Sequence, residues 1–179
     1  MTLILAATVP AMGIGRKGGL PWSLKKEMNF FRKVTDGNIV IMGRKTWESI
    51  PVKFRPLRNR VNIVVSRSID GLPEGVISAC SLENAVAHAN KLQGDIFVMG
   101  GAQLYTSALA HHQAKHILLT EIATQFDDCD TFFHFDQQKW TKQPSQALRD
   151  FVSGKIKLED TNHEEDGVSY EFTLYNRVD

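Results

Sequence analysis

The sequence predicts an α/β fold in which one domain is built on a mainly parallel β-sheet with helices on both faces. Over the first two thirds of the chain, short continuous apolar runs alternate with helix-like segments, which is typical of parallel strands buried on both faces. The last third instead alternates apolar and polar residues around a turn sequence, which predicts a closing antiparallel hairpin. The length of 179 residues suits a single domain, 1–179.

The composition and the charge balance exclude several classes of protein. Hydrophobic residues make up 42% of the chain, which is ordinary for a folded globular protein. Twenty-one Lys and Arg against 20 Asp and Glu leave a net charge of +1, so we expect no nucleic-acid or membrane-surface partner. Cys80 and Cys129 lie far apart, which excludes a disulfide framework and a cysteine zinc site. Without a signal peptide, a membrane span or any sign of self-association, we expect a cytoplasmic monomer.

The first half of the chain is expected to hold two helices between three strands. The sequence predicts a helix over 24–35 with Ser23 as its N-cap. A second, short helix over 44–49 should stop before Pro51. The strands share continuous aliphatic content and are expected at 3–9, 39–42 and 61–65.

The second half repeats the pattern before it changes to the hairpin. Ser81 should cap a helix over 82–92 that Gly94 closes. A further helix is expected over 102–109. Strands are expected at 95–99 and 116–120, and the hairpin pairs 150–158 with 168–174 around a turn at 164–167.

The segment from Gly13 to Gly18 matches the dinucleotide-binding pattern G-x-G-x-x-G. In that fingerprint a helix opens within the motif, whereas Pro21 follows here and no helix starts before Ser23. Two alternatives remain open: a mobile glycine-rich lid and a plain surface loop.

Glu27 is the one charged residue on the apolar face of the helix over 24–35. A projection at 100° per residue places Glu27 between Phe31 and Val34, with Met28 on the same face. Burial disfavours an ionised carboxylate, so the pKa of Glu27 should rise, which is typical of a working acid. The alternative is that Glu27 only favours the positive amino end of the helix.

Three strand ends have the composition of phosphate-binding corners. The strands at 39–42 and 95–99 run into glycines and then into helices, where backbone N–H groups can meet an anion. The strand at 61–65 ends in Ser66-Arg67-Ser68, and basic residues at such an end favour a 2′-phosphate over a free ribose hydroxyl. We therefore expect NADP(H), and we expect no metal, because neither the histidines nor the aspartates have a metal-ligand spacing.

Several longer motifs share one family pattern. They are Gly13-Ile14-Gly15, Leu20-Pro21-Trp22, Glu27 with Phe30-Phe31, Met42-Gly43-Arg44-Lys45-Thr46-Trp47-Glu48-Ser49-Ile50-Pro51, Arg55-Pro56-Leu57, Asn59-Arg60-Val61-Asn62, Ser66-Arg67 and Met99-Gly100-Gly101-Ala102-Gln103-Leu104-Tyr105. With them the chain resembles the dihydrofolate reductase family, especially its fungal members, over nearly its whole length. The resemblance implies a central eight-stranded sheet and the NADPH-dependent reduction of dihydrofolate to tetrahydrofolate, with antifolate inhibitors as further ligands.

The resemblance also implies roles for individual residues. Glu27 would bind the pterin ring with support from Thr120, Trp22 would hold a nearby water, and Arg60 would pair with the α-carboxylate of the glutamate. The Gly100–Gly101 peptide would be cis. Catalytic residues are expected at Glu27, Trp22 and Leu20. Substrate contacts are expected at Leu5, Ala7, Glu27, Phe31, Ile50, Leu57, Arg60 and Thr120. Cofactor contacts are expected at Ala7, Ile14, Gly15, Gly18, Leu20, Gly43, Arg44, Lys45, Thr46, Ser66, Arg67, Gly100, Gly101, Ala102, Gln103, Leu104 and Tyr105.

Two other functions are compatible with parts of this pattern. A pyrimidine reductase of riboflavin synthesis would share the fold and NADPH, but it leaves Glu27 and Arg60 unexplained. A non-catalytic folate- or nucleotide-binding protein would not need the complete set of acid, lid and phosphate corners.

Overall fold

A computed structural model of the chain describes residues 1–68 and 70–179. Its helices are α1 (Lys25–Thr35), α2 (Arg44–Ser49), the 3₁₀ turn η1 (Val52–Phe54), α3 (Leu82–Ala89), α4 (Ala102–Ala110) and α5 (Ser145–Val152). Its strands are β1 (Thr2–Thr8), β2 (Gly13–Gly15), β3 (Ile39–Gly43), β4 (Val61–Val65), β5 (Ile77–Ala79), β6 (Ile96–Val98), β7 (His116–Ile122), β8 (Thr131–Phe132), β9 (Trp140–Lys142), β10 (Asn162–Glu165) and β11 (Val168–Arg177).

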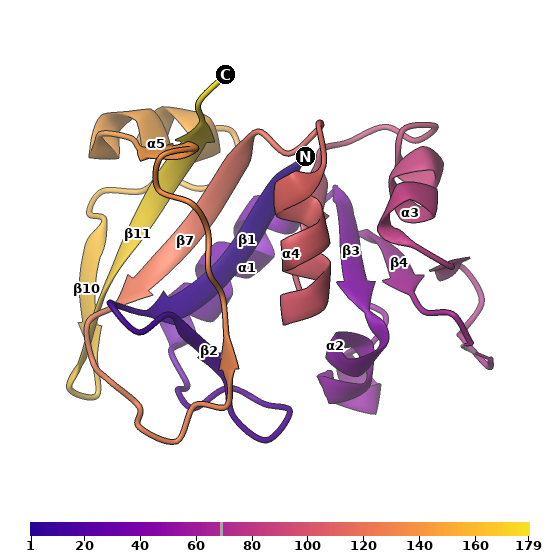
Figure 1. Cartoon of the computed structure of the whole chain (residues 1–179), viewed down its shortest axis with the longest axis horizontal. Coiled ribbons are helices and arrows are strands. Elements are labelled where there is room, and N and C mark those ends of the chain that lie inside the picture. The colour runs from indigo at the N-terminus through magenta and orange to yellow at the C-terminus, as the bar shows by residue number, and fades with distance from the viewer. Residues whose placement is uncertain (69) are drawn as a thin grey trace.

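The central sheet has the order β10-β11-β7-β1-β6-β3-β4-β5, with β9 also paired to β11. The pairs from β7 to β5 are parallel, and β11 joins β7, β9 and β10 in antiparallel pairs. The predicted mainly parallel sheet of eight strands is therefore confirmed, and the additional β9 shares one edge of β11 with β10. In Figure 1 the arrowheads of β1, β3 and β7 all point to the lower edge of the molecule, where the β2 loop and α2 lie.

The sheet separates two hydrophobic cores. Leu3 and Leu5 of β1 pack with α3 and α4 on one face, whereas Ile4 packs with α1, α2 and α5 on the other. This division follows from strand geometry, because successive side chains point to opposite faces. Figure 1 shows α4 in front of the middle of the sheet and α1 behind it.

The carboxyl-terminal hairpin differs from the prediction. Its turn is confirmed at Asp166 and Gly167, which have positive φ, but 164 and 165 belong to its first strand, which is β10 rather than 150–158. The helix α5 occupies 145–152, and its Leu148 and Val152, four residues apart as on one helix face, are fully buried. The rest of the predicted strand, 153–158, is turn and irregular chain, so the strand expected there is wrong.

The two predicted N-caps have opposite outcomes. The hydroxyl of Ser81 accepts a hydrogen bond from the backbone N–H of Asn84 at 3.0 Å, which confirms the cap of α3. Ser23 does not cap α1, because that helix starts after Leu24 and has no side-chain cap from its own N-cap residue. The predicted 82–92 helix also ends earlier, at Ala89. The short strands β2, β5, β8 and β9 carry no sequence periodicity and were missed.

Candidate active site

The carboxyl ends of the parallel strands bring the predicted site residues to one edge of the sheet. Thr8, Gly43, Val65 and Val98 end strands β1, β3, β4 and β6, which run in the same direction. In open α/β sheets, ligands bind outside these carboxyl ends. The three glycine and basic corners therefore lie along one edge, as the sequence predicted.

Glu27 lies in the first turn of α1 and is buried, with 8% of its surface exposed. The hydroxyl of Thr120 on β7 donates a long hydrogen bond of 3.4 Å to its Oε1 atom. Burial raises the pKa of Glu27 to about 7, and the Thr120 bond opposes that rise only in part. The predicted acid on the apolar face of the helix is thus a side chain that titrates near neutral pH.

Trp22 brings a second polar group to the same region. Its side chain is buried, and its indole Nε1–H has no hydrogen-bond partner within residues 1–68 and 70–179. An unsatisfied buried donor is unfavourable by about 1–3 kcal/mol. Such a donor fits a site whose polar ligand or water completes the hydrogen bond.

The residues expected along the substrate channel share one hydrophobic cluster. Phe31, Ile50 and Leu57 are partly buried against the same core as Trp22. The guanidinium of Arg60 donates to the Thr35 hydroxyl at 3.1 Å and lies 6.0 Å from the centre of the Phe31 ring. The tertiary fold therefore places the Arg60 cation near Phe31, which lies one helical turn after Glu27 on α1.

The side chains of Leu5 and Ala7 do not lie on the α1 face of the sheet, which is the face that carries Glu27. Both side chains are buried on the α4 face of the sheet. Ala6, which is paired with Thr120, packs on the α1 face. This difference is the one-residue alternation of a strand.

Met28 is more exposed than its place on the apolar face of the helix predicts. The helix projection placed it in the core, but 53% of its surface is exposed. Met28 follows Glu27 and lies three residues before Phe31, so these two apolar side chains are neighbours on the surface of α1. A ligand that covers this apolar side chain would gain buried area.

The glycine corners of β3 and β6 touch one another. The backbone N–H of Gly43 donates to the carbonyl of Gly100 at 2.8 Å. A Cβ atom added at Gly100 would lie 3.3 Å from the Thr46 hydroxyl, and φ is +128° there, so a side chain would crowd and strain this corner. The Gly100–Gly101 peptide is cis, as expected.

Basic and polar side chains surround these corners. Arg44, Lys45 and Arg67 are exposed, and Ser66 is half-buried beside them after β4. In the described parts of the chain, the three basic side chains take part in no ion pair. Ala102 and Gln103 open helix α4 at the same edge, whereas Leu104 and Tyr105 are buried behind it, and the Tyr105 hydroxyl donates to the Ile4 carbonyl at 2.8 Å.

Comparison with known proteins decides the family. The family model of dihydrofolate reductase matches residues 1–177. The chain belongs to the dihydrofolate reductase family. It is 41% identical to the dihydrofolate reductase of Candida albicans, over 99% of this chain and 97% of that protein. It is 40% identical to that of Pneumocystis carinii, over 99% and 96%. A solved dihydrofolate reductase structure from Schistosoma mansoni matches with a TM-score of 0.79, 34% identity and coverage of 98% and 96%.

Within this reductase, the segment expected as a lid is a strand and a turn. Gly13–Gly15 form β2, which pairs with β8, and no helix opens between Gly13 and Gly18, so the dinucleotide-fingerprint interpretation is wrong. The Asp130 carboxylate accepts the backbone N–H of Lys17 at 2.8 Å, and Asp128 pairs with Arg16 at 2.7 Å.

The turn itself is exposed. Gly18 adopts a positive φ of 77°, and 53% of the Leu20 surface is accessible. The half-buried Ile14 packs on the same core as Ala7, next to the glycine corners. The 127–131 segment therefore holds this turn through Arg16 and Lys17, while Gly18, Gly19 and Leu20 are exposed.

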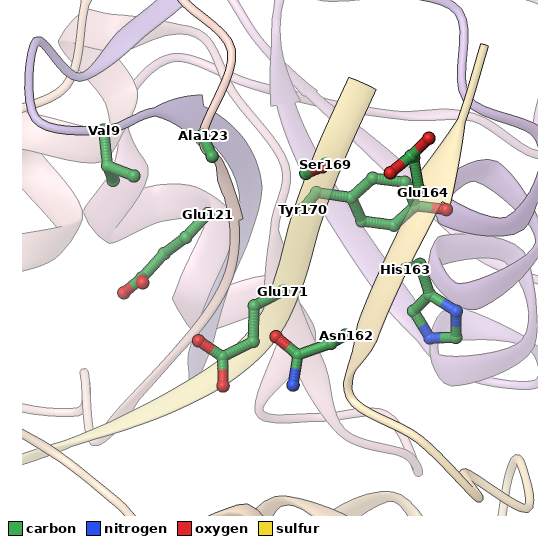
Figure 2. Close-up of a pocket in the computed structure, with 9 residues that line it drawn as sticks. All are labelled: Val9, Glu121, Ala123, Asn162, His163, Glu164, Ser169, Tyr170 and Glu171. Atoms are coloured by element: carbon green, nitrogen blue, oxygen red, sulfur yellow. The ribbon is translucent and has the colours of Figure 1, made fainter. Parts of the chain in front are cut away.

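A shallow groove on the outer face of the carboxyl-terminal strands is a separate feature of the surface. Figure 2 shows Glu121, Glu171 and Asn162 directed toward the same space. Lys142 pairs with Glu121 at 3.0 Å and with Glu171 at 3.2 Å. The groove contains none of the predicted site residues, and the carboxylates at its floor are already paired.

The described residues contain no cluster suited to a metal ion, and no helix among them is both long and apolar enough to cross a membrane.

Proposed function

We propose that this reductase converts dihydrofolate to tetrahydrofolate with NADPH, and that Glu27 supports protonation at N5 of the pterin. Reduction of dihydrofolate to tetrahydrofolate is the activity of the family to which the chain belongs. The observation that carries the role of Glu27 is its burial beside Thr120 with a pKa of about 7. A group with such a pKa populates both its protonated and its ionised form near neutral pH, so it can donate and accept a proton there.

The substrate would lie between α1 and the edge of the sheet. In its ionised form, Glu27 would accept hydrogen bonds from the amino and ring N–H groups of the pterin, while Phe31 and Leu57 enclose the aminobenzoyl group. Arg60 would hold the glutamate α-carboxylate, because a guanidinium pairs with a carboxylate through two parallel hydrogen bonds. The unpartnered Nε1–H of Trp22 would orient a water near the reacting ring.

The glycine corners fit a pyrophosphate, and the surrounding basic residues fit a 2′-phosphate. Side chains are absent where Gly43 and Gly100 approach each other, so an anion could come close to the first-turn N–H groups of α2 and α4, which have no side-chain cap. Arg44, Ser66 and Arg67 would bind the 2′-phosphate. When bound, NADPH supplies the hydride that reaches C6 of the pterin. The lid from Gly13 to Leu20 would close over the site and exclude water.

The extent of the domain, the inhibitors, the location and the oligomeric state belong to the same proposal. Strands of one sheet come from both ends of the chain, Thr2 and Arg177, which supports a single reductase domain over 1–179. Antifolate inhibitors would occupy the Glu27 pocket. A cytoplasmic location and a monomeric state remain predictions.

The role of Glu27 is tested by the variant Glu27→Gln, assayed as dihydrofolate-dependent oxidation of NADPH. General acid assistance contributes about 10²–10⁴-fold, so we expect most activity to be lost at neutral pH. The loss should shrink at lower pH, where solution supplies protonated substrate. Glu74→Gln, a change at an exposed carboxylate, is the matched control. A near-native rate with an unchanged pH profile would show that Glu27 takes no part in the protonation of the substrate.

The cofactor is tested with Arg67→Ala and Arg44→Ala. A charge-assisted hydrogen bond contributes about 1.5–3 kcal/mol, so the native protein should prefer NADPH over NADH by about tenfold or more. Each variant should narrow that preference, chiefly by weakening NADPH. Equal kcat/KM for both cofactors in the native protein would contradict the proposal.

A further inference from the structure

The carboxyl-terminal hairpin supplies the cap of the helix that carries the pocket acid. The Glu165 carboxylate, at the end of β10, accepts the backbone N–H of Lys25 through Oε2 at 2.7 Å. It accepts the N–H of Lys26 through Oε1 at 2.7 Å. These are two of the four N–H groups that an α-helix leaves unpaired at its amino end. Because α1 has no side-chain cap of its own, a residue about 140 positions away satisfies its first turn.

A third hydrogen bond holds this carboxylate in place. The hydroxyl of the buried Tyr170 on β11 donates to Oε1 of Glu165 at 2.7 Å. Partial burial would raise the pKa of Glu165, but the bonds from Tyr170, Lys26 and Lys25 outweigh it and lower that pKa. Glu165 is therefore a fixed negative charge at neutral pH.

We propose that Glu165 is a positioning residue for the reaction: its carboxylate fixes the first turn of α1 and thereby keeps Glu27 in the place and in the form that the pterin needs. This inference rests on the role proposed for Glu27. Glu27 is the third residue of α1, one after Lys26, so the hydrogen bonds to Glu165 and the acid belong to the same turn.

Two electrostatic effects of Glu165 act on Glu27 in the same direction. The amino end of a helix carries about half a positive charge, which favours an ionised carboxylate in the first turn. The Glu165 carboxylate neutralises that end, and its negative charge also disfavours a second one at Glu27. Burial is the largest cause of the raised pKa of Glu27, and Glu165 adds to the rise.

The other groups that face Glu27 do not supply a charge of this kind. Thr120 from β7 donates a hydrogen bond to it. Burial raises the pKa values of Tyr105 on α4 and Tyr170 on β11, with the charge of Glu27 as a smaller cause, so both phenols stay neutral near pH 7. The ammonium groups of Lys25 and Lys26 belong to exposed side chains. Glu165 is thus the fixed carboxylate that acts on the acid.

The test is a titration of Glu27 by NMR in the ligand-free full-length protein, with ¹³C-labelled glutamate carboxyls assigned through Glu27→Gln. In Glu165→Gln the midpoint of Glu27 should fall by about 0.2–0.7 pH units, as expected for the interaction of a charge with a helix end. The pH profile of kcat should move toward acid by a similar amount. Glu165→Asp retains the charge, so the Glu27 midpoint in that variant should lie close to its native value.

Glu164→Gln is the matched control. It removes the same charge one residue earlier on β10, from an exposed side chain that lines the outer groove of Figure 2, and it should leave the midpoint in place. An unchanged midpoint in a folded Glu165→Gln protein would overturn the inference, as would an equal shift in Glu164→Gln. The titration needs no turnover, so it separates this inference from the proposed function, which depends on the activity of Glu27→Gln.

Discussion

Replacement of Glu27 by glutamine should change how the stability of the ligand-free protein depends on pH. The pKa of Glu27 is about 7 in the folded protein against an ordinary value of 4.5. The folded state therefore binds the proton more tightly than the unfolded state. The stability associated with this proton is fully present below about pH 4.5 and is lost as the pH rises through about 7.

The size of this effect follows from the two pKa values. The pKa rises from 4.5 to about 7, and each pH unit of this rise is worth about 1.36 kcal/mol. The folded protein therefore loses about 3 kcal/mol of stability when Glu27 goes from fully protonated at low pH to fully ionised at high pH. Between about pH 5 and about pH 8, linkage predicts that the native protein loses about 2.5 kcal/mol relative to Glu27→Gln. Glutamine has nearly the same size and cannot ionise, so the difference between the two proteins isolates this proton.

The assay is urea unfolding at a series of pH values, with the free energy of unfolding extrapolated to water. The informative quantity is the change with pH of the difference between the two proteins, because any constant packing effect of the substitution cancels. Glu74→Gln, at an exposed carboxylate, should show no comparable dependence. A difference between Glu27→Gln and the native protein that stays constant from acid to alkaline pH would refute the reasoning, since Glu27 would then ionise equally in both states.

Three further predictions concern the channel, the lid and a helix cap. Arg60→Lys should raise the KM for dihydrofolate by about tenfold with little change in kcat, because the contact is remote from the reacting ring and an ammonium cannot pair bidentately; an unchanged KM would place the carboxylate site elsewhere. Gly15→Ala puts a Cβ atom 3.3 Å from the Gly19 carbonyl and should slow turnover with little change in Tm, whereas Gly19→Ala has room at 3.8 Å and should not; equal rates would return the segment to a plain surface loop. Ser81→Ala removes the cap of α3 and should lower the free energy of unfolding by about 1 kcal/mol in urea with native kcat/KM; native stability would mean that water replaces the cap.

The sequence alone determined the features that depend on local patterns. Continuous apolar runs such as 39–42 predicted buried parallel strands, because a strand covered on both faces has no polar side. The position of Glu27 among apolar neighbours followed from helical periodicity over two turns, and its burial is confirmed. The cis peptide between Gly100 and Gly101 was implied by the family resemblance that the longer motifs carry, and the structure contains it.

Other features lay beyond any local pattern. The segment 150–158 was predicted as a strand from its alternation, although 150–152 end α5 and 153–158 form neither helix nor strand. The local sequence allowed more than one assignment for this segment, and packing against the rest of the chain selected one.

Tertiary structure also decided which distant residues meet. The contacts of Arg60 with Thr35, of Glu27 with Thr120, and of Glu165 with the first turn of α1 join positions that are separated by about 25, 93 and 140 residues. Periodicity and capping patterns operate within a few turns of one element, so they predicted the acid but not the carboxylate that caps its helix. That partner could be recognised only once the sheet order had brought β10 to the amino end of α1, because hydrogen bonds and charges act through distance in space and not along the chain.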